Sequence, residues 1–188
     1  IVEYLELVDQ EVDKSVEVTD RLLRLGMTTP EEPELVEVAS VVQDTLALLQ
    51  WEAEHLGVTL ASDHPPGLRV MASDSELRMV VLNLVHNAFH AMPKGGGLNV
   101  TSQSADGWIV IAVHDQGIGI EPDRLPRIFD PFYSRRADGS KGVGLGLSIV
   151  RTIVENYGGR VEVTSVAGQG SVFSVFLQDA AGAGELAL

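Results

Sequence analysis

The stretch KGVGLGLSIV, residues 141–150, places three glycines directly before what reads as a helix. Glycine loses more backbone freedom on folding than any other residue, at a cost of roughly 0.5 to 1 kcal/mol relative to alanine. Gly142, Gly144 and Gly146 leave no β-carbon at the helix start, where unpaired N–H groups carry about half a positive charge. The pattern therefore predicts an anion site at the start of a helix over 143–157.

Composition and charge exclude several classes of protein. The chain has 188 residues, 45% of them hydrophobic, and a formal net charge of −14, which argues against nonspecific nucleic-acid binding through Lys and Arg. Without cysteine, it has no disulfides or thiolate zinc sites. No apolar run approaches the roughly 20 residues of a membrane helix. We expect this segment to be cytoplasmic. Because it begins with Ile1, we also expect it to be part of a longer protein, whose other parts can include a membrane anchor.

Residues 1–26 carry a stripe of mostly apolar residues with the spacing of a helical seam. It comprises Ile1, Leu5, Val8, Val12, Thr19, Leu22 and Gly26, with Ser15 in the remaining position. Such a helix either packs on its own domain or pairs in a bundle or dimer, and pairing is favoured because nothing nearby covers the stripe. Pro30 and Pro33 disfavour continuation of the helix, so we separate 1–29 from a domain over 34–178.

Downstream, the hydrophobic pattern predicts helices over 39–55, 73–92 and 143–157 and strands over 58–61, 68–72, 98–103, 108–114, 160–165 and 171–177. Ser73 and Glu76 form the capping-box pattern that opens the second helix. Residues 116–141 show no sustained helical or strand periodicity of apolar residues. We expect residues 179–188 to form a flexible tail. We predict an α+β fold, a two-layer sandwich of one mixed sheet with helices on one face, preceded by the long N-terminal helix.

Two asparagines lie four residues apart in the predicted helix 73–92, so their side chains share one face. Asn is a mediocre helix former, so the pair calls for a reason. Asn83 and Asn87 are either exposed or helix-bridging amides, or Asn87 supplies an amide oxygen to Mg²⁺. That hard cation keeps several waters and shares phosphate oxygens with few protein ligands. The spacing alone leaves both interpretations open.

The segment VHDQGIGI, residues 113–120, leads Asp115 out of a strand and into a G-x-G sequence. A buried carboxylate can accept a hydrogen bond from the exocyclic amine of adenine, worth about 1.5 to 3 kcal/mol. A guanine carbonyl would present a lone pair there instead. The pattern thus favours selection of a base, and the alternative is an ordinary Asp-x-Gly turn.

Five motifs follow in order: the asparagine pair, DQGIG, FDPFYSRR, GVGLGL and GQGSVF. In sequence and spacing they resemble the N, G1, F, G2 and G3 boxes of the catalytic ATP-binding domain of bacterial sensor histidine kinases. That domain belongs to the GHKL superfamily, shared with type II topoisomerase and mismatch-repair ATPases. The resemblance spans residues 34–178 and implies the Bergerat ATP-binding fold. Residues 1–26 are similar to the second helix of the dimerisation and phosphotransfer hairpin.

The resemblance implies a site for ATP and Mg²⁺. By it, Asn87 is the Mg²⁺ ligand and Asp115 is the carboxylate that recognises adenine. It also implies that Phe129 and Phe132 anchor a mobile lid over the nucleotide. Further nucleotide contacts are implied for Gly117, Gly119, Ile120, Gly142, Val143, Gly144, Leu145, Gly146 and Leu147.

Other residues are implied near the phosphates. Ser134, Arg135 and Arg136 stand where many relatives have Thr-Thr-Lys, so Arg136 could contact the γ-phosphate as a bidentate donor. Val143 replaces a hydroxyl residue common in relatives, which removes one phosphate hydrogen bond. His90 lies where relatives often carry a basic or polar residue near the phosphates, and plain solvent exposure is the alternative.

Asn83 stands where hydrolytic relatives tend to place a Glu that activates water. An amide cannot act as a general base, so transfer to a protein group is favoured over hydrolysis. None of the five histidines has the acidic neighbour and downstream Asn-Pro expected of the family's phosphorylated histidine. We therefore expect the acceptor outside this segment, and His114 reads as an ordinary strand residue.

The predicted function is that of the catalytic domain of a two-component sensor histidine kinase. It would pass the ATP γ-phosphoryl group to a histidine on the missing hairpin helix and then to a response regulator receiver domain. We expect a homodimer at full length. The alternative is a phosphotransfer or dimeric scaffold that no longer binds nucleotide, against which the intact Asn87, Asp115 and glycines argue. A topoisomerase-type or mismatch-repair ATPase ranks last because it would require Glu at position 83.

Overall fold

The computed structural model describes residues 32–134 and 142–180, all of which belong to the compact unit Glu32–Leu188. The predicted N-terminal helix and most of the predicted tail lie outside these residues, so both stay predictions, as do the proposed domain limits. Among the described helices, none has the length and apolar character needed to cross a membrane.

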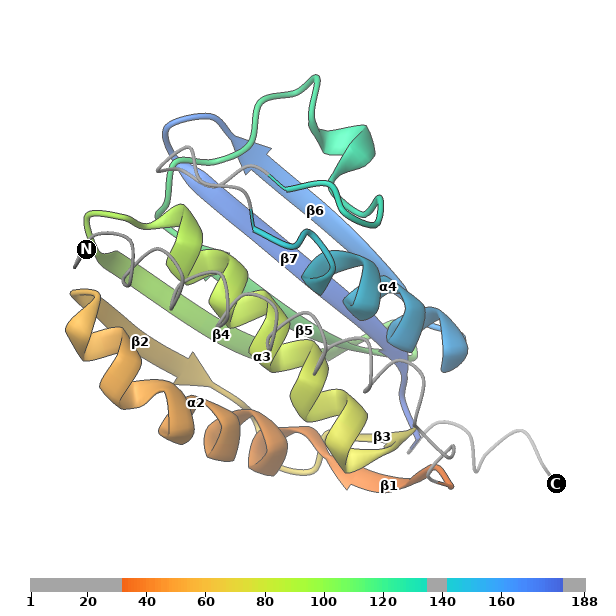
Figure 1. The fold of residues 1–188 in the computed structure, drawn as a ribbon. Coiled ribbons are helices and arrows are strands. Elements are labelled where there is room, and N and C mark those ends of the chain that lie inside the picture. Colours follow the sequence, from red (N-terminus) through yellow and green to blue (C-terminus); the bar gives the residue numbers. More distant parts are fainter. Residues whose placement is uncertain (1–31, 135–141, 181–188) are drawn as a thin grey trace, which may run out of the picture. The chain divides into compact units, whose positions relative to one another are not determined.

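A five-stranded sheet forms one layer of this unit (Figure 1), with the order β2-β4-β5-β7-β6. Its strands are β2 (Val58–Asp63), β4 (Gly96–Ala105), β5 (Trp108–Asp115), β6 (Arg160–Val166) and β7 (Gly170–Gln178). Strand β2 pairs parallel with β4, and all other neighbours are antiparallel. The sheet is therefore mixed, as predicted.

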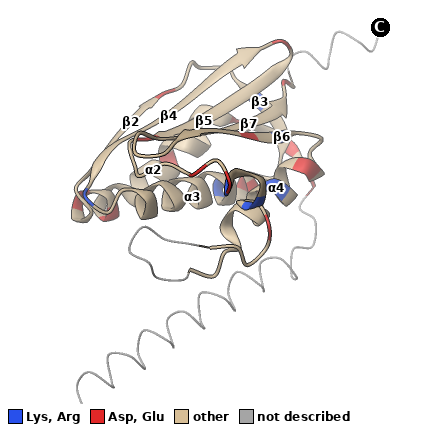
Figure 2. Cartoon of the chain, turned by 90° about the horizontal axis from the view of Figure 1, so that it is seen from above, with Lys and Arg blue, Asp and Glu red and all other residues tan. Residues whose placement is uncertain are grey.

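Three helices form the second layer: α2 (Val38–His55), α3 (Asp74–Ala91) and α4 (Gly146–Asn156). Figure 2, turned by 90° from Figure 1, shows them along one face of the sheet. The predicted α+β architecture with helices on a single face is confirmed.

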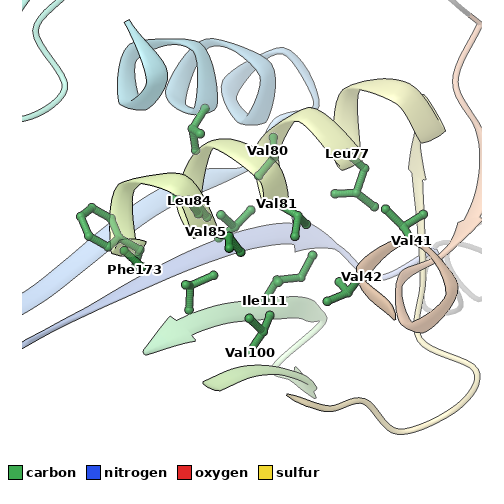
Figure 3. Close-up of a cluster of buried hydrophobic side chains, with 14 of the residues drawn as sticks. Val41, Val42, Leu77, Val80, Val81, Leu84, Val85, Val100, Ile111 and Phe173 are labelled. Atoms are coloured by element: carbon green, nitrogen blue, oxygen red, sulfur yellow. The ribbon is translucent and has the colours of Figure 1, made fainter. Parts of the chain in front are cut away.

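The core lies between these layers (Figure 3) and follows from the alternation of side chains along the strands. Val100 on β4, Ile111 on β5 and Phe173 on β7 point from the sheet toward the helices, and each is at most 1% exposed. Leu77, Val81, Leu84 and Val85 of α3 meet them at the spacing of a helical face. Burial of this apolar surface is the main stabilising contribution to such a fold.

A second, two-stranded sheet was not predicted from the sequence. Strand β1 (Glu34–Glu37) pairs antiparallel with β3 (Arg69–Ala72), and the inward-facing Val36 and Val70 lie opposite each other. The strands predicted over 58–61 and 68–72 flank one turn-rich segment, yet they join different sheets. The stretch 34–37 escaped prediction because a four-residue strand with one buried side chain gives almost no periodic signal.

The N-terminus of α3 is tied to the C-terminus of α4. As the capping-box pattern predicts, the Ser73 hydroxyl accepts a hydrogen bond from the Glu76 N–H, 3.3 Å away. The reciprocal bond is different, because the Ser73 N–H donates to the Tyr157 hydroxyl, 2.9 Å away. That hydroxyl in turn donates to the Glu76 carboxylate. A tyrosine at the end of α4 thus completes the cap of α3.

Candidate functional site

The two asparagines of α3 lie on the side of the helix that faces α4. Both are half-buried, and the Asn83 Nδ2 group donates a hydrogen bond to the Met79 carbonyl, 2.8 Å away. A β-carbon built on Gly146 would lie 2.9 Å from Asn83 Oδ1. Asn87 lies one turn further along the same face. The sequence prediction that the pair shares a face holds, and that face meets the beginning of α4.

Asp115 reaches the inner face of the sheet because it follows Val113 by two residues on β5, and Val113 is part of the core. The side chain is 6% exposed. Its Oδ1 accepts hydrogen bonds from the Gly117 N–H at 2.8 Å and from the Ser171 N–H at 3.3 Å. Burial raises the pKa of Asp115 above its ordinary value, and hydrogen bonds from Gly117 and Ser171 offset part of that rise.

The loop 116–120 after Asp115 is held on one side by the end of α3 and the chain that follows it. The Ile118 N–H donates to the Ala91 carbonyl at 2.9 Å, and a β-carbon on Gly117 would lie 2.5 Å from that same oxygen. Gln116 exchanges two bonds with Gly97, one at 3.2 Å between backbones and one at 2.9 Å to its side-chain oxygen. Only glycine fits at position 117.

The other side of this loop meets the hairpin of β6 and β7. The Ile120 N–H donates to the Ser165 hydroxyl at 2.8 Å. Gly119 has a φ of +66°, and a β-carbon there would lie 2.1 Å from the Val166 carbonyl oxygen. The atoms nearest to that β-carbon belong to the backbones of Val166 and Ala167, so no side-chain rotation could make room. The loop is thus clamped into one conformation beside the Asp115 carboxylate.

The glycine-rich approach to α4 differs from the prediction in where the helix begins. The helix was expected from residue 143, but α4 begins at Gly146, because Gly144 has a φ of +72° that no right-handed helix contains. A β-carbon on Gly144 would lie 2.6 Å from the Phe132 carbonyl carbon. Val143 and Leu145 therefore precede the helix, and Leu145 is buried. Leu147 is half-buried in the first turn.

The start of α4 has no side-chain cap. The first N–H groups of a helix lack partners inside the helix and attract negative charge. Gly142 lies just upstream, where its N–H donates to the Ser134 hydroxyl at 3.1 Å. The glycines and the uncapped N-terminus together form a surface that an anion can approach closely, next to the Asn83 side of α3.

The two phenylalanines expected to anchor a lid differ in their packing. Phe129 is half-buried against the core near the short 3-10 helix Leu125–Arg127. The Phe132 side chain is 70% exposed, and its attachment runs through the backbone, whose N–H donates to the Gly144 carbonyl at 2.9 Å. The role of the two residues as lid anchors therefore stays a prediction.

Three other residues from the sequence analysis are Arg136, His90 and His114. Arg136 lies outside the described residues, so its predicted role is untested. His90 is exposed in the last turn of α3, and His114 is half-buried on β5 beside Asp115 but on the opposite face.

Within residues 32–134 and 142–180, no group of three or more His, Asp or Glu side chains is arranged to hold a metal ion.

Sequence reasoning missed the residues that act through hydrogen bonds around the loop 116–120. Ser165 and Ser171 belong to this set, as does the Ala91 carbonyl. The motif GQGSVF contained Ser171, and its alternation with Phe173 would have placed it on the inner face. No sequence signal marks Ala91, because every residue carries a backbone carbonyl.

Comparison with known proteins gives a family match over the part of the chain that holds this site. Residues 72–181 match the family described as histidine kinase-, DNA gyrase B-, and HSP90-like ATPase. The match includes α3, the loop after Asp115 and the start of α4. The resemblance that the five motifs predict is confirmed.

Individual relatives extend the similarity over most of the chain. Sensor histidine kinase ZraS of Salmonella typhimurium is 33% identical over 177 residues, which are 93% of this chain and 37% of ZraS. Histidine protein kinase DivJ of Caulobacter vibrioides is 35% identical over 184 residues, which are 93% of this chain and 30% of DivJ. The chain thus spans about a third of the length of these curated relatives.

A solved structure of full-length ShkA in complex with AMPPNP is similar in fold. It superposes with a TM-score of 0.78 at 27% sequence identity and covers 95% of this chain and 39% of ShkA.

Proposed function

The chain belongs to the family of histidine kinase-, DNA gyrase B- and HSP90-like ATPases and carries the ATP-binding catalytic domain of a sensor histidine kinase, and on this premise we propose how its residues bind and use ATP. The proposal assigns the base to Asp115, the phosphates to the start of α4 and a metal ion to Asn87. The catalysed reaction and the partners of the whole protein are part of the proposal, because the chain spans only about a third of the length of its curated relatives.

The observation that carries the base assignment is the buried Asp115 carboxylate. Both backbone hydrogen bonds to this side chain fall on Oδ1, so we assign the exocyclic amine of adenine to Oδ2. A carboxylate accepts from an amine more strongly than a neutral oxygen does. Guanine would place a carbonyl lone pair against the carboxylate at that point, so the site selects adenine. Gly117 and Gly119 pack closely against the backbones of Ala91 and Val166 and so hold the wall beside the carboxylate, which ends at Ile120.

The phosphates of ATP fit the glycine-rich start of α4. The bare backbone of Gly144 and Gly146 lets this segment pack against the Phe132 backbone and the Asn83 side chain, where β-carbons would lie 2.6 and 2.9 Å from the nearest atoms. The uncapped N–H groups of α4 offer hydrogen bonds to phosphate oxygens without a basic side chain. We assign Gly142, Val143, Leu145 and Leu147 to the same surface, and His90 and Arg136 to the phosphate side.

Asn87 is our candidate for the Mg²⁺ ligand. It is half-buried on the face of α3 that meets α4, and its amide oxygen is a ligand type that Mg²⁺ accepts. Mg²⁺ bound there with the phosphates would neutralise part of their charge. The Mg²⁺ assignment rests on the family's chemistry and on this placement.

We propose phosphoryl transfer to a histidine as the reaction. The bond between the γ-phosphorus and its bridging oxygen breaks, a phosphorus–nitrogen bond forms on the acceptor imidazole, and ADP leaves. Asn83 cannot take a proton from water, because an amide is not a base at neutral pH, so hydrolysis is not assisted. We place the acceptor histidine outside this chain, with a receiver domain as the next acceptor, in a full-length homodimer that presents this domain to cytoplasmic ATP.

Calorimetric titration with AMPPNP, an ATP analogue, in the presence of Mg²⁺ tests the proposal. We expect binding by the native chain, little binding of the corresponding GTP analogue, and loss of AMPPNP binding in Asp115→Asn. Asp106→Asn is the matched control, because Asp106 lies in the exposed turn at the other end of β5. A folded native chain that binds no AMPPNP would reject the proposal and favour a nucleotide-independent scaffold.

A further inference from the structure

The hydroxyl of Ser165 is at the centre of a hydrogen-bond network beside Asp115. Ser165 is the second-last residue of β6 and faces the helix side of the sheet. Its Oγ lies 2.8 Å from the Ile120 N–H, 2.9 Å from the Gly170 carbonyl oxygen and 3.0 Å from the Ser171 Oγ. Three partners fill the capacity of a hydroxyl, which has one proton and two lone pairs.

The chemistry of two of the three partners fixes the direction of their bonds. The Gly170 carbonyl can only accept, so the Ser165 proton goes to it. The Ile120 N–H can only donate, so it takes one lone pair of Ser165. The Ser171 hydroxyl lies 3.0 Å from the Ser165 Oγ and is also hydrogen-bonded to the Asp115 side chain. Ser165 therefore joins the backbone of Ile120 to the beginning of β7, where the Ser171 N–H donates to Asp115.

This arrangement connects both walls of the Asp115 site. Ile120 ends the loop 116–120, and Ser171, the second residue of β7, donates its N–H to Asp115 Oδ1. The Ser171 hydroxyl is also close enough to Asp115 to lower the pKa of that carboxyl, against the larger effect of burial.

We propose that Ser165 is a positioning residue for base recognition: its hydroxyl fixes the loop at Ile120 against the beginning of β7, next to the Asp115 carboxylate. This inference rests on the proposed assignment of adenine to Asp115. Ser165 itself is not assigned a contact with the nucleotide. Its effect runs through the two neighbours, so its loss weakens binding and selectivity for the base.

The space around Ser165 explains why a small hydroxyl residue is required. A β-carbon on Gly119 would lie 2.1 Å from the Val166 carbonyl oxygen, and one on Gly170 would lie 2.0 Å from the Asp115 carbonyl oxygen. The backbones on both sides of Ser165 are thus in close contact. A residue without a hydroxyl leaves the Ile120 N–H and the Gly170 carbonyl without this partner, and a large one would force the walls apart.

The test is calorimetric titration of AMPPNP with Mg²⁺ into four variants and the native chain. Ser165→Ala removes the hydroxyl, Ser165→Cys replaces it by a weak donor and weak acceptor of similar size, and Ser165→Thr restores it. Thr164→Ala is the matched control, because Thr164 is the adjacent residue on the exposed outer face of β6. The GTP analogue is titrated in parallel, and the melting temperature of each ligand-free protein is recorded.

We expect Ser165→Ala and Ser165→Cys to raise the Kd for AMPPNP about 3- to 10-fold, the loss of one net hydrogen bond. Ser165→Thr should return the Kd to within about twofold of the native value, and Thr164→Ala should leave it unchanged. The preference for AMPPNP over the GTP analogue should fall in parallel. If Ser165→Ala does not fold, Ser165→Cys carries the same comparison.

A native Kd in folded Ser165→Ala and Ser165→Cys would overturn the inference, and a lower melting temperature of these two variants with that native Kd would indicate a structural role only. Failure of Ser165→Thr to restore binding overturns it too. These outcomes differ from failure of the proposed function, in which the native chain itself does not bind AMPPNP. In that case the inference fails together with its premise.

Discussion

The side-chain oxygen of Asn83 faces the backbone of Gly146 so closely that a β-carbon at residue 146 would lie 2.9 Å from it. Asn83 is fixed in this position because its Nδ2 group donates to the Met79 carbonyl at 2.8 Å. Helices α3 and α4 therefore meet through an amide and a glycine at the point where α4 begins. Any side chain added at 146 must displace the amide that the candidate site uses.

Gly146→Ala should destabilise the fold through this contact. The new methyl forces Asn83 to rotate and to lose its bond to Met79, and overpacking of this kind costs about 1 to 3 kcal/mol. In an Asn83→Ala background the same substitution should cost at least about 0.5 kcal/mol less, because the obstructing amide is absent. Urea unfolding of the native chain, both single variants and the double variant measures the difference. An equal cost in both backgrounds would show that the contact is not the cause.

Gly119→Ala should destroy the base site, and Gly107→Ala provides a matched comparison. Both glycines have positive φ, +66° and +79°, a region that costs other residues about 1 to 2 kcal/mol. A β-carbon at 107 meets nothing within 4 Å, whereas one at 119 would lie 2.1 Å from the Val166 carbonyl oxygen. We expect Gly119→Ala to lose about 2 kcal/mol more than Gly107→Ala and to lose AMPPNP binding.

Thermal unfolding and calorimetric titration of these two variants provide the measurement. Gly107→Ala should bind AMPPNP as the native chain does, since its turn is at the far end of β5 from Asp115. Similar losses of stability in the two variants would mean that the loop 116–120 adapts, contrary to a clamped site.

The fold was largely predictable because its core obeys simple periods. Alternation along β5 and β7 and the helical spacing of α3 predict their inner faces from residues such as Ile111, Phe173 and Leu84. Pairing was less predictable, because β2 joins β4 in parallel across the whole of α3, a contact that no local signal encodes. The start of α4 was misplaced since apolar residues continue through Val143 and Leu145, while the left-handed φ of Gly144 is invisible in the sequence.

The candidate site was predictable where side chains or glycines carry the chemistry. Asp115, Asn87 and the glycines stand in short motifs whose spacing has a physical meaning. The supporting contacts of Ile118 with Ala91 and of Ile120 with Ser165 use backbone groups, which leave little or no trace in residue identity.

Tyr157→Phe should lower stability without touching the nucleotide site. The substitution removes the bond from the Ser73 N–H, 2.9 Å long, and the bond to the Glu76 carboxylate, and so releases the start of α3 from the end of α4. We expect a loss of about 1 to 2 kcal/mol in urea unfolding. Tyr133→Phe is the control, since it keeps the ring that lies 4.8 Å from the Arg127 guanidinium carbon. A change of the same size in both variants would contradict a specific role of the Tyr157 hydroxyl.

Asp115→Asn should abolish ATP binding and still leave the folded state at least as stable as the native one at neutral pH. Burial raises the pKa of Asp115 above its ordinary value, so the folded protein holds this proton more tightly than the unfolded chain does. Stability from this group is therefore present at acid pH and is lost as the pH rises through the folded pKa. At pH 7 the ionised, buried carboxylate therefore lowers the stability of the folded state. The candidate site nevertheless requires this carboxylate.

The asparagine removes that charge and keeps an oxygen for the Gly117 and Ser171 N–H groups. The difference in unfolding free energy between Asp115→Asn and the native chain should therefore grow in favour of the variant as the pH rises from below the ordinary pKa of an aspartate to above neutral pH. Asp106→Asn, on an exposed turn, should show no such trend. If the variant is less stable than the native chain at pH 8, the hydrogen bonds to the carboxylate stabilise the fold by more than its burial destabilises it. The ionised Asp115 would then not lower the stability of the fold.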